Sequence, residues 1–438
     1  MQHIRIQKNS FKSLTKILGF MKVEALGRKT GATNRKCRKC SMNVFLRSYW
    51  LLINSGSFSF DAWAQHASSL INSTVSAEAL HKRISAKLIG FLKLLIAFSF
   101  KQKLPRLFDS KLFEPFAHVY IQDATHFSLP AVLSKAFPGS SSMLGESATA
   151  KIQAVFCLTR GIFSGFLLNS FRDADQKDAP RIVEQPEPGD LLIRDQGYFT
   201  LPSFNMILEK GAHFLSRLKF GIGVYCPKTG EQIDLPKYLK KNDFIDKWVF
   251  IGSKTKVKCR IVAKKLPADV AAERIRKAKK HSGKKTSHSK QYFVMLGYSI
   301  FITSVDEQVW NGDDIAKAYR CRWYIEILFK SWKSGLKIKF NIPKQYVSKL
   351  RAQFFFYAVL LLVNLVVMPT FCFALVKGLV KSRVISILRT CQYIAGKLPH
   401  IMKLKRLDKL LDQIVYFCAY DKRQNRVNAI EMMQLVNA

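Results

Sequence analysis

Three carboxylates are candidates for a chemical site in a chain that is poor in acids, with 30 Asp and Glu against 71 Lys and Arg. Asp123 and Asp195 each lie at or just after a short apolar run, and Glu326 lies in a stretch with helical spacing. Carboxylates brought together repel one another unless a cation is present, and hard oxygen ligands select Mg²⁺ or Mn²⁺. Two such ions can activate a nucleophile and stabilise the leaving oxygen in phosphoryl transfer. The three acids therefore predict a two-metal site that acts on phosphodiesters.

Strands must position the first two of these acids. The run HVYIQDATHFSLP, from His118 to Pro130, is β-rich and contains Asp123, and a short apolar run from Gly189 ends in Asp195 and a glycine turn. We expect the two acids at the ends of neighbouring strands. A lone Asp at a strand end is usually a turn former or a helix cap, and that is the alternative here.

A helix must position the third acid. The stretch Asp313–Leu336 has a start signal at Asn311 and a stop signal at Gly335, which predicts one helix. At 100° per residue, one stripe about 60° wide carries four polar side chains. They are Tyr319, Arg322, Glu326 and Lys333. The opposite arc is apolar and predicts docking on a core through Tyr324, Ile325, Leu328, Phe329, Trp332 and Leu336. A solvated face with charge pairing is the alternative interpretation of the stripe.

The charge balance predicts the partner. The formal net charge of +41 implies a polyanion, with nucleic acid as the first candidate and a membrane surface as the second. The stretch 268–290 is a basic helix or arm suited to phosphate contact, with a solubilising loop as the alternative. A length of 438 residues allows two or three domains, and 48% apolar residues exclude a disordered chain.

Two local features could suggest other kinds of protein. Nine scattered cysteines indicate free thiols in a reducing compartment, and the pair Cys37 and Cys40 lacks the further ligands of a zinc site. The N-terminus has no apolar core of a signal peptide. Ala352–Val376 carries no charge and is long enough to span a bilayer, but it contains Asn364 and Pro369. We expect a buried core helix broken near Pro369, and a membrane-attached protein is the alternative.

The four polar residues of the stripe also form a known signature. Tyr319, Arg322, Glu326 and Lys333 have the spacing Tyr-x2-Arg-x3-Glu-x6-Lys, and the chain resembles the DDE transposases of bacterial insertion sequences in the class named for this YREK signature. IQDATHFSL resembles the segment with the first Asp of that family, and LLIRDQGYF the segment with the second. Gln196 stands where the family commonly has Arg. The resemblance covers roughly residues 60–370.

The resemblance implies a fold and a division of the chain. The fold class would be α/β, an RNase H-like mixed sheet with helices, a β-rich insertion domain, and helical N- and C-terminal regions. Its segments would be a basic, helical DNA-binding region at 1–110, the first part of the core at 111–210, the insertion at 211–306, the second part of the core at 307–376, and a helical region at 377–438. Within the first segment, Ser59 and Ser76 are expected helix caps of a helix-turn-helix-like module or of an ordinary helical cap.

The resemblance also implies an activity. Asp123, Asp195 and Glu326 would be the catalytic residues and would bind two Mg²⁺ or Mn²⁺ ions. Tyr319, Arg322 and Lys333 would contact DNA phosphates. The reaction would nick transposon ends, release the element through a hairpin, and join its 3′-OH to target DNA. The partners would be double-stranded DNA of the inverted repeats and of the target, and a second copy in a homodimer, with no membrane. The protein would be located in the bacterial cytoplasm and, when it is bound to DNA, at the nucleoid. A catalytically inactive DNA-binding relative is the alternative.

Overall fold

The computed structural model describes residues 22–33, 40–54, 58–101, 111–142, 145–182, 186–281, 288–338, 342, 347–403 and 408–420. The described chain forms two compact units. Unit 1 takes the described residues of 22–101, 124–173 and 324–420, and unit 2 those of 111–123 and 174–323. The division into five segments stays a prediction. Cys37 and the first 21 residues lie outside the described residues, so the expectations about zinc and a signal peptide stay predictions as well.

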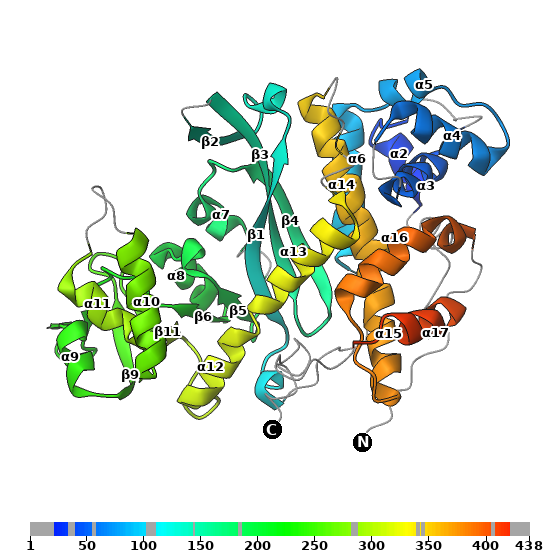
Figure 1. The fold of residues 1–438 in the computed structure, drawn as a ribbon. Helices are drawn as coiled ribbons and strands as arrows, with labels where there is room; N and C mark the ends of the chain where they lie inside the picture. The colour runs from blue at the N-terminus through cyan, green and yellow to red at the C-terminus, as the bar shows by residue number, and fades with distance from the viewer. Residues whose placement is uncertain are drawn as a thin grey trace. The chain divides into compact units, whose positions relative to one another are not determined.

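Unit 2 is built on a series of neighbouring strands, several of which are labelled in Figure 1. The order is β1 (Val119–Leu129, up to Asp123 in this unit), β5 (Leu191–Arg194), β6 (His213–Arg217), β11 (Tyr298–Thr303), β10 (Val257–Lys265), β9 (Phe244–Ile251), β7 (Val224–Tyr225) and β8 (Gln232–Ile233). Strands β1, β5 and β6 are parallel, whereas β6, β11, β10 and β9 pair antiparallel. The range 211–306, expected to be β-rich, contains β6 to β11 together with helices, and its status as an insertion stays a prediction.

Helices and an apolar cluster complete unit 2. The helices are α7 (Asp175–Ile182), α8 (Leu201–Glu209), α9 (Leu235–Lys241), α10 (Ala268–His281), α11 (Lys290–Leu296) and α12 (Gly312–Arg320). The cluster is formed by side chains such as Phe204, Phe214, Val249 and Ile261, all at most 1% exposed. The basic stretch predicted at 268–290 forms α10 in its first part, and residues 282–287 lie outside the described residues.

Unit 1 is mainly helical, with a small group of strands. Its elements are α2 (Val23–Lys29), α3 (Met42–Leu51), α4 (Phe60–Ile71), α5 (Ala77–Lys82), α6 (Ala86–Ser99), β2 (Pro138–Ser142), β3 (Gly145–Cys157), β4 (Ile162–Ser170), α13 (Trp323–Gly335, from Tyr324 in this unit), α14 (Lys349–Leu362), the π-helical turn η6 (Val363–Val367), α15 (Met368–Val380), α16 (Ile387–Lys403) and α17 (Asp408–Phe417). The side chains of Ser59 and Ser76 accept the N–H groups of Ala62 and Ala79, so the expected helix caps are confirmed.

The charge-free helix lies in the core of unit 1. Within the described part of the chain, Lys349–Val380 is long and apolar enough to cross a membrane by length and composition, and its most apolar window is entirely buried in the structure. Helices α3 and α6 pack on α14, and the indole of Trp50 donates to the carbonyl of Ala358 at 2.8 Å. The expectation of a buried core helix is confirmed.

The expected break near Pro369 is a change of helix type and not an interruption of the helix. The helix runs on through the π-helical turn Val363–Val367, and Pro369 lies in the first turn of α15. Pro369 cannot donate a backbone hydrogen bond inside this continuous helix, and the irregular π-helical turn lies directly before it. The turn contains Asn364, whose amide donates to Ser99 Oγ at 2.9 Å and to the Phe163 carbonyl at 3.1 Å.

Candidate active site

Parallel pairing brings the first two acids to one level of the sheet in unit 2. Gln122 of β1 pairs with Arg194 of β5, so Asp123 and Asp195 are the next residues on two neighbouring strands. The prediction that they come from neighbouring strands is confirmed. Asp195 follows the end of β5, as expected, but Asp123 lies inside β1, which continues to Leu129. Buried Phe127 and Leu129 keep the alternating pattern beyond the acid and extend the strand.

Hydrogen bonds of the residues before and after Asp195 fix the turn that follows β5. The N–H of Tyr198 donates to the Asp195 carbonyl at 3.0 Å, and Gln196 Nε2 donates to the Leu218 carbonyl at 2.7 Å. The fully buried guanidinium of Arg194 donates to Ser203 Oγ and to the Ala179 carbonyl, and burial lowers the pKa of Arg194 to about 10. These contacts fix the backbone that carries Asp195, so its carboxylate has a defined place at the edge of the sheet.

A cation and a phenol contact the two acids. Arg322 Nη1 donates to Asp123 Oδ2 at 3.1 Å, and Arg322 Nε lies 3.9 Å from Asp195 Oδ1. The hydroxyl of Tyr319 donates to Asp195 Oδ1 at 3.3 Å. Burial and the charge of Asp195 raise the pKa of Tyr319 to about 12, so this hydroxyl keeps its proton at neutral pH. Within unit 2, two residues of the signature therefore contact the two acids.

The prediction of one helix over Asp313–Leu336 is wrong. Helix α12 begins at Gly312 with a capping box of Asn311 and Asp314, as the start signal predicted, but it ends at Arg320. Helix α13 begins at Trp323 and ends at the expected Gly335. The apolar arc predicted for docking is buried throughout, as expected.

The break between the two helices lies at Cys321 and Arg322. The N–H of Cys321 bonds to the Ala318 carbonyl and that of Arg322 to the Tyr319 carbonyl, which is tighter than α-helical spacing. Tyr319 and Arg322 are 5% and 8% exposed, so they do not lie on a solvated stripe. One helical wheel cannot describe the four signature residues, because Arg322 sits in the turn and points toward the acids.

The other two signature residues lie on α13 in unit 1. Glu326 is half-buried, and Lys333 Nζ lies 5.3 Å from the ring centroid of Phe127. Desolvation lowers the pKa of Lys333. Among the described residues, no set of three or more His, Cys, Asp or Glu side chains is placed to hold a metal ion. Because Asp123 and Asp195 belong to unit 2 and Glu326 to unit 1, the three-ligand set stays a prediction.

The donor chemistry of the two acids in unit 2 fits a divalent cation. Asp123 and Asp195 offer hard carboxylate oxygens from adjacent strands, and these oxygens already face one cation, the guanidinium of Arg322. Hard oxygen donors suit Mg²⁺ and Mn²⁺. The side chain of Asp195 is 44% exposed, which leaves its carboxylate accessible to an ion and to substrate.

Sequence reasoning missed Arg217. Arg194 of β5 pairs with Ser216 of β6, so Arg217 stands at the level of Asp195 on the third parallel strand. Its guanidinium lies 5.3 Å from the ring centroid of Tyr319, and its Nε is buried without a hydrogen-bond partner among the described residues. The signal was a basic residue directly after the apolar strand HFLS, but its meaning depends on the parallel register of β5 and β6.

Comparisons with known proteins agree with the resemblance in the sequence. Residues 114–365 match the family model described as the transposase DDE domain. The transposase for insertion sequence element IS231B of Bacillus thuringiensis subsp. berliner is 28% identical over 338 residues, which cover 72% of this chain and 70% of that protein. The transposase for IS1151 of Clostridium perfringens is 26% identical over 284 residues, 60% of each chain. A solved piggyBac transposase synaptic complex with hairpin DNA has a TM-score of 0.41 and 7% identity, covering 92% of this chain and 83% of that one. The resemblance to insertion-sequence DDE transposases is confirmed.

Proposed function

The chain belongs to the transposase DDE-domain family, and on that premise we propose that it cuts DNA at the ends of an insertion sequence and joins them to target DNA. In the first step, water attacks the phosphorus at the end of the element, the P–O3′ bond breaks, and a 3′-OH is released. That 3′-OH then attacks a target phosphodiester, so that one P–O bond replaces another. Between these two steps, the 3′-OH attacks the opposite strand, which forms a hairpin at the element end and breaks the bond of that strand to the flanking DNA. A second water then opens the hairpin and restores the 3′-OH for joining. The single observation that carries the proposal is the group formed by Asp123, Asp195 and Arg322 inside the matched residues.

The strand order supports an RNase H-like core. In unit 1 the order is β4, β3, β1, and in unit 2 it is β1, β5, β6, with β1, β5 and β6 parallel. The acids thus stand on the parallel part of a mixed sheet. Because β6 pairs with β5, we place the end of the first core segment after Arg217 rather than at residue 210, and the β-rich insertion after it.

The residues of the site would have different roles in the reaction. Asp123, Asp195 and Glu326 would hold Mg²⁺ or Mn²⁺, most simply as two ions, which would supply an activated nucleophile and a stabilised leaving oxygen. Tyr319 orients Asp195 through its hydroxyl. Arg322 balances the charge of the acids and, at the edge of the site, contacts a DNA phosphate. Lys333 contacts a second phosphate on the same DNA.

The proposed reaction also implies an assembly, because two ends of the element must be held together for joining. We propose that two copies of the chain form a homodimer that binds both inverted repeats. The relatives above are bacterial, and we place this protein in the bacterial cytoplasm and, when bound to DNA, at the nucleoid. The membrane-attached alternative loses its support, because the apolar helix Lys349–Val380 is buried in unit 1.

A denaturing gel of the reaction products tests the proposed reaction. The substrate is flanking DNA of the gene that carries short inverted repeats, identified by sequencing, labelled at the 3′ end and incubated with the wild-type protein, Mg²⁺ and a target plasmid. We expect a nick at the repeat boundary, then a hairpin of altered mobility, then a joined product. Specific binding without any nick would support the inactive DNA-binding relative instead. Nicks and joined products without a hairpin would remove only the hairpin step.

Removing the signature cations is expected to weaken end binding and to make it less dependent on salt. Arg322→Ala or Lys333→Ala each deletes one phosphate contact, so the slope of log affinity against log salt should become shallower by about 1. The measurement is fluorescence anisotropy with labelled repeat DNA between low and moderate salt.

The matched control is Lys265→Ala, which deletes an exposed cation outside the signature, one that pairs with Asp243 at 2.8 Å. It should leave the slope unchanged. Equal slopes for all three variants and the wild type would show that Arg322 and Lys333 do not contact phosphate.

A further inference from the structure

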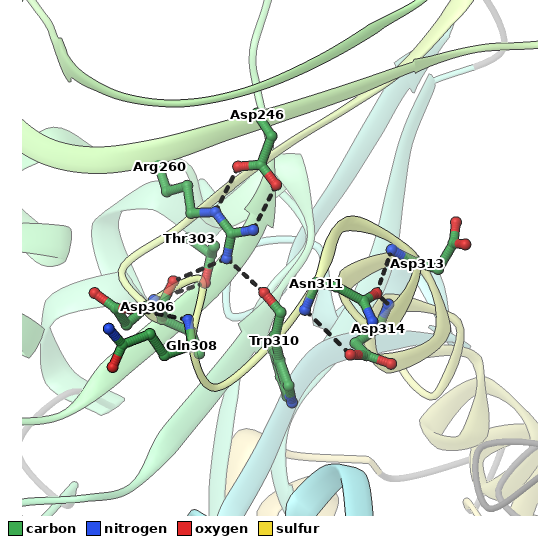
Figure 2. Close-up of polar contacts among 10 residues, drawn as sticks. Asp246, Arg260, Thr303, Asp306, Gln308, Trp310, Asn311, Asp313 and Asp314 are labelled. Atoms are coloured by element: carbon green, nitrogen blue, oxygen red, sulfur yellow. Dashed lines mark hydrogen bonds and ion pairs between the residues drawn. The ribbon is translucent and has the colours of Figure 1, made fainter.

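A buried arginine joins the β-rich part of unit 2 to the helix that leads into the site. Arg260 is 1% exposed, and its Nε and Nη2 donate to the two carboxylate oxygens of Asp246 (Figure 2). Its remaining nitrogen, Nη1, donates to the Trp310 carbonyl at 2.7 Å. One guanidinium therefore ties strand β10 to strand β9 on one side and to the loop before α12 on the other.

The residue that Arg260 holds is itself anchored at its other end. The indole of Trp310 is 1% exposed, and its Nε1 donates to the Leu112 carbonyl at 2.9 Å. Leu112 lies a few residues before β1, the strand that carries Asp123. Trp310 is therefore a core residue of unit 2, fixed at its backbone carbonyl by Arg260 and at its indole by Leu112.

Trp310 stands directly before the cap of α12. Asn311 Oδ1 accepts the N–H groups of Asp313 and Asp314, and Asp314 Oδ2 accepts the N–H of Asn311 (Figure 2). The capped helix is about 14 Å long at 1.5 Å per residue. Its last turn carries Tyr319, which donates to Asp195, and Arg322 follows two residues after its end. A shift of the capped end would therefore move both residues relative to the acids.

We propose that Arg260 and Asp246 are a positioning pair for the active site. They fix the start of α12 to strands β9 and β10 and thereby set Tyr319 and Arg322 against Asp195 and Asp123. The role of those four residues in DNA cleavage rests on the proposed function above. Arg260 binds Asp246 and the Trp310 carbonyl rather than Asp123 or Asp195, so the pair acts through α12.

The chemistry of the pair favours positioning over bulk stability. A buried ion pair adds little stability compared with apolar side chains of the same volume, whereas the planar fork of arginine fixes direction. Lysine could keep the charge, but it cannot bind both oxygens of Asp246 and the Trp310 carbonyl in one plane. An ion pair of Lys264 with Asp313 also joins β10 to α12, but both side chains are more than half exposed and the pair contributes little.

Hydrogen exchange measured by mass spectrometry tests the pair in the full-length protein. In Arg260→Lys, exchange of the amides in 304–322 should be faster by about tenfold or more, while exchange in β9 and β10 stays near the wild-type rate. Lys264→Met, which breaks the exposed pair, should leave both regions unchanged. Unchanged exchange in 304–322, or an equal rise in β9 and β10, would overturn the proposal.

If Arg260→Lys unfolds, Asp246→Asn is the second test of the pair. Asparagine keeps the shape of the side chain and one hydrogen-bond acceptor but removes the charge. This variant should show the same selective increase in the exchange rate of the amides in 304–322. The same two outcomes would overturn the proposal in this variant. The readout needs no cleavage, so a wild-type protein that fails to nick DNA would remove the proposed function and leave this test intact.

Discussion

Asp195→Asn is expected to reduce the rate of DNA nicking by about 10³-fold or more, equivalent to about 4 kcal/mol, while binding to the inverted repeats persists. Asparagine keeps the shape of the side chain but removes the charge that holds a divalent ion. Asp123→Asn and Glu326→Gln should have effects of the same size, because the three acids are expected to act as one set. Single-turnover nicking on pre-bound repeat DNA measures the rate, and anisotropy measures binding.

The matched control is Asp243→Asn, which removes the carboxylate of an exposed pair with Lys265. Its nicking rate should equal that of the wild type. If any one of the three site variants nicks at the wild-type rate, that acid is not a ligand. A loss of binding that parallels the loss of nicking would mean that the acids serve the fold instead of the reaction.

Asn364→Leu is expected to lower the stability of unit 1 by about 3 kcal/mol or more, which corresponds to about 10 °C in Tm. The Asn364 side chain is fully buried, and its Oδ1 accepts the N–H of Phe163 at 3.1 Å while its amide donates to Ser99 and to the Phe163 carbonyl. Leucine fills a similar volume but leaves these polar groups in an apolar surrounding. Calorimetry of the purified protein measures the change.

The control for this variant is Leu365→Met, an apolar exchange of similar volume at a buried neighbour, which should cost less than about 1.5 kcal/mol. An Asn364→Leu protein as stable as the wild type would show that these hydrogen bonds do not hold the helix in the core. A rise in stability together with a need for detergent would favour the membrane-attached alternative, because lipid prefers leucine to asparagine.

Local signals were sufficient where the structure depends on near neighbours. The β-rich run from His118 predicted β1, the apolar run before Asp195 predicted β5, and the Asn311 signal predicted the start of α12. The apolar runs also placed both acids on strands, whereas the adjacency of these strands depends on the pairing of β1 with β5. These features need only strand periodicity and capping chemistry, which a single stretch of chain carries.

Signals failed where distant contacts decide the local structure. Nothing between Asp313 and Gly335 predicts a helix end at Arg320, because no glycine or proline is present and the apolar spacing continues. The turn at Cys321 and Arg322 occurs where the guanidinium meets Asp123 and Asp195, from strands far away in the sequence. Arg217 was missed for the same reason, since its place beside Tyr319 depends on the parallel pairing of β5 and β6. The π-helical turn at Asn364 likewise involves partners in α6 and β4 that no local pattern names.

The most direct test of the proposed site is metal-directed cleavage of the protein itself. Fe²⁺ replaces Mg²⁺ in the wild-type protein bound to repeat DNA, and ascorbate with peroxide generates hydroxyl radicals that cut the backbone near the bound ion. We predict cuts near Asp123, Asp195 and Glu326 together, all suppressed by excess Mg²⁺ and all lost in Asp195→Asn. Cuts near Asp123 and Asp195 with none near Glu326, or cuts only elsewhere, would contradict a single site built from these three acids.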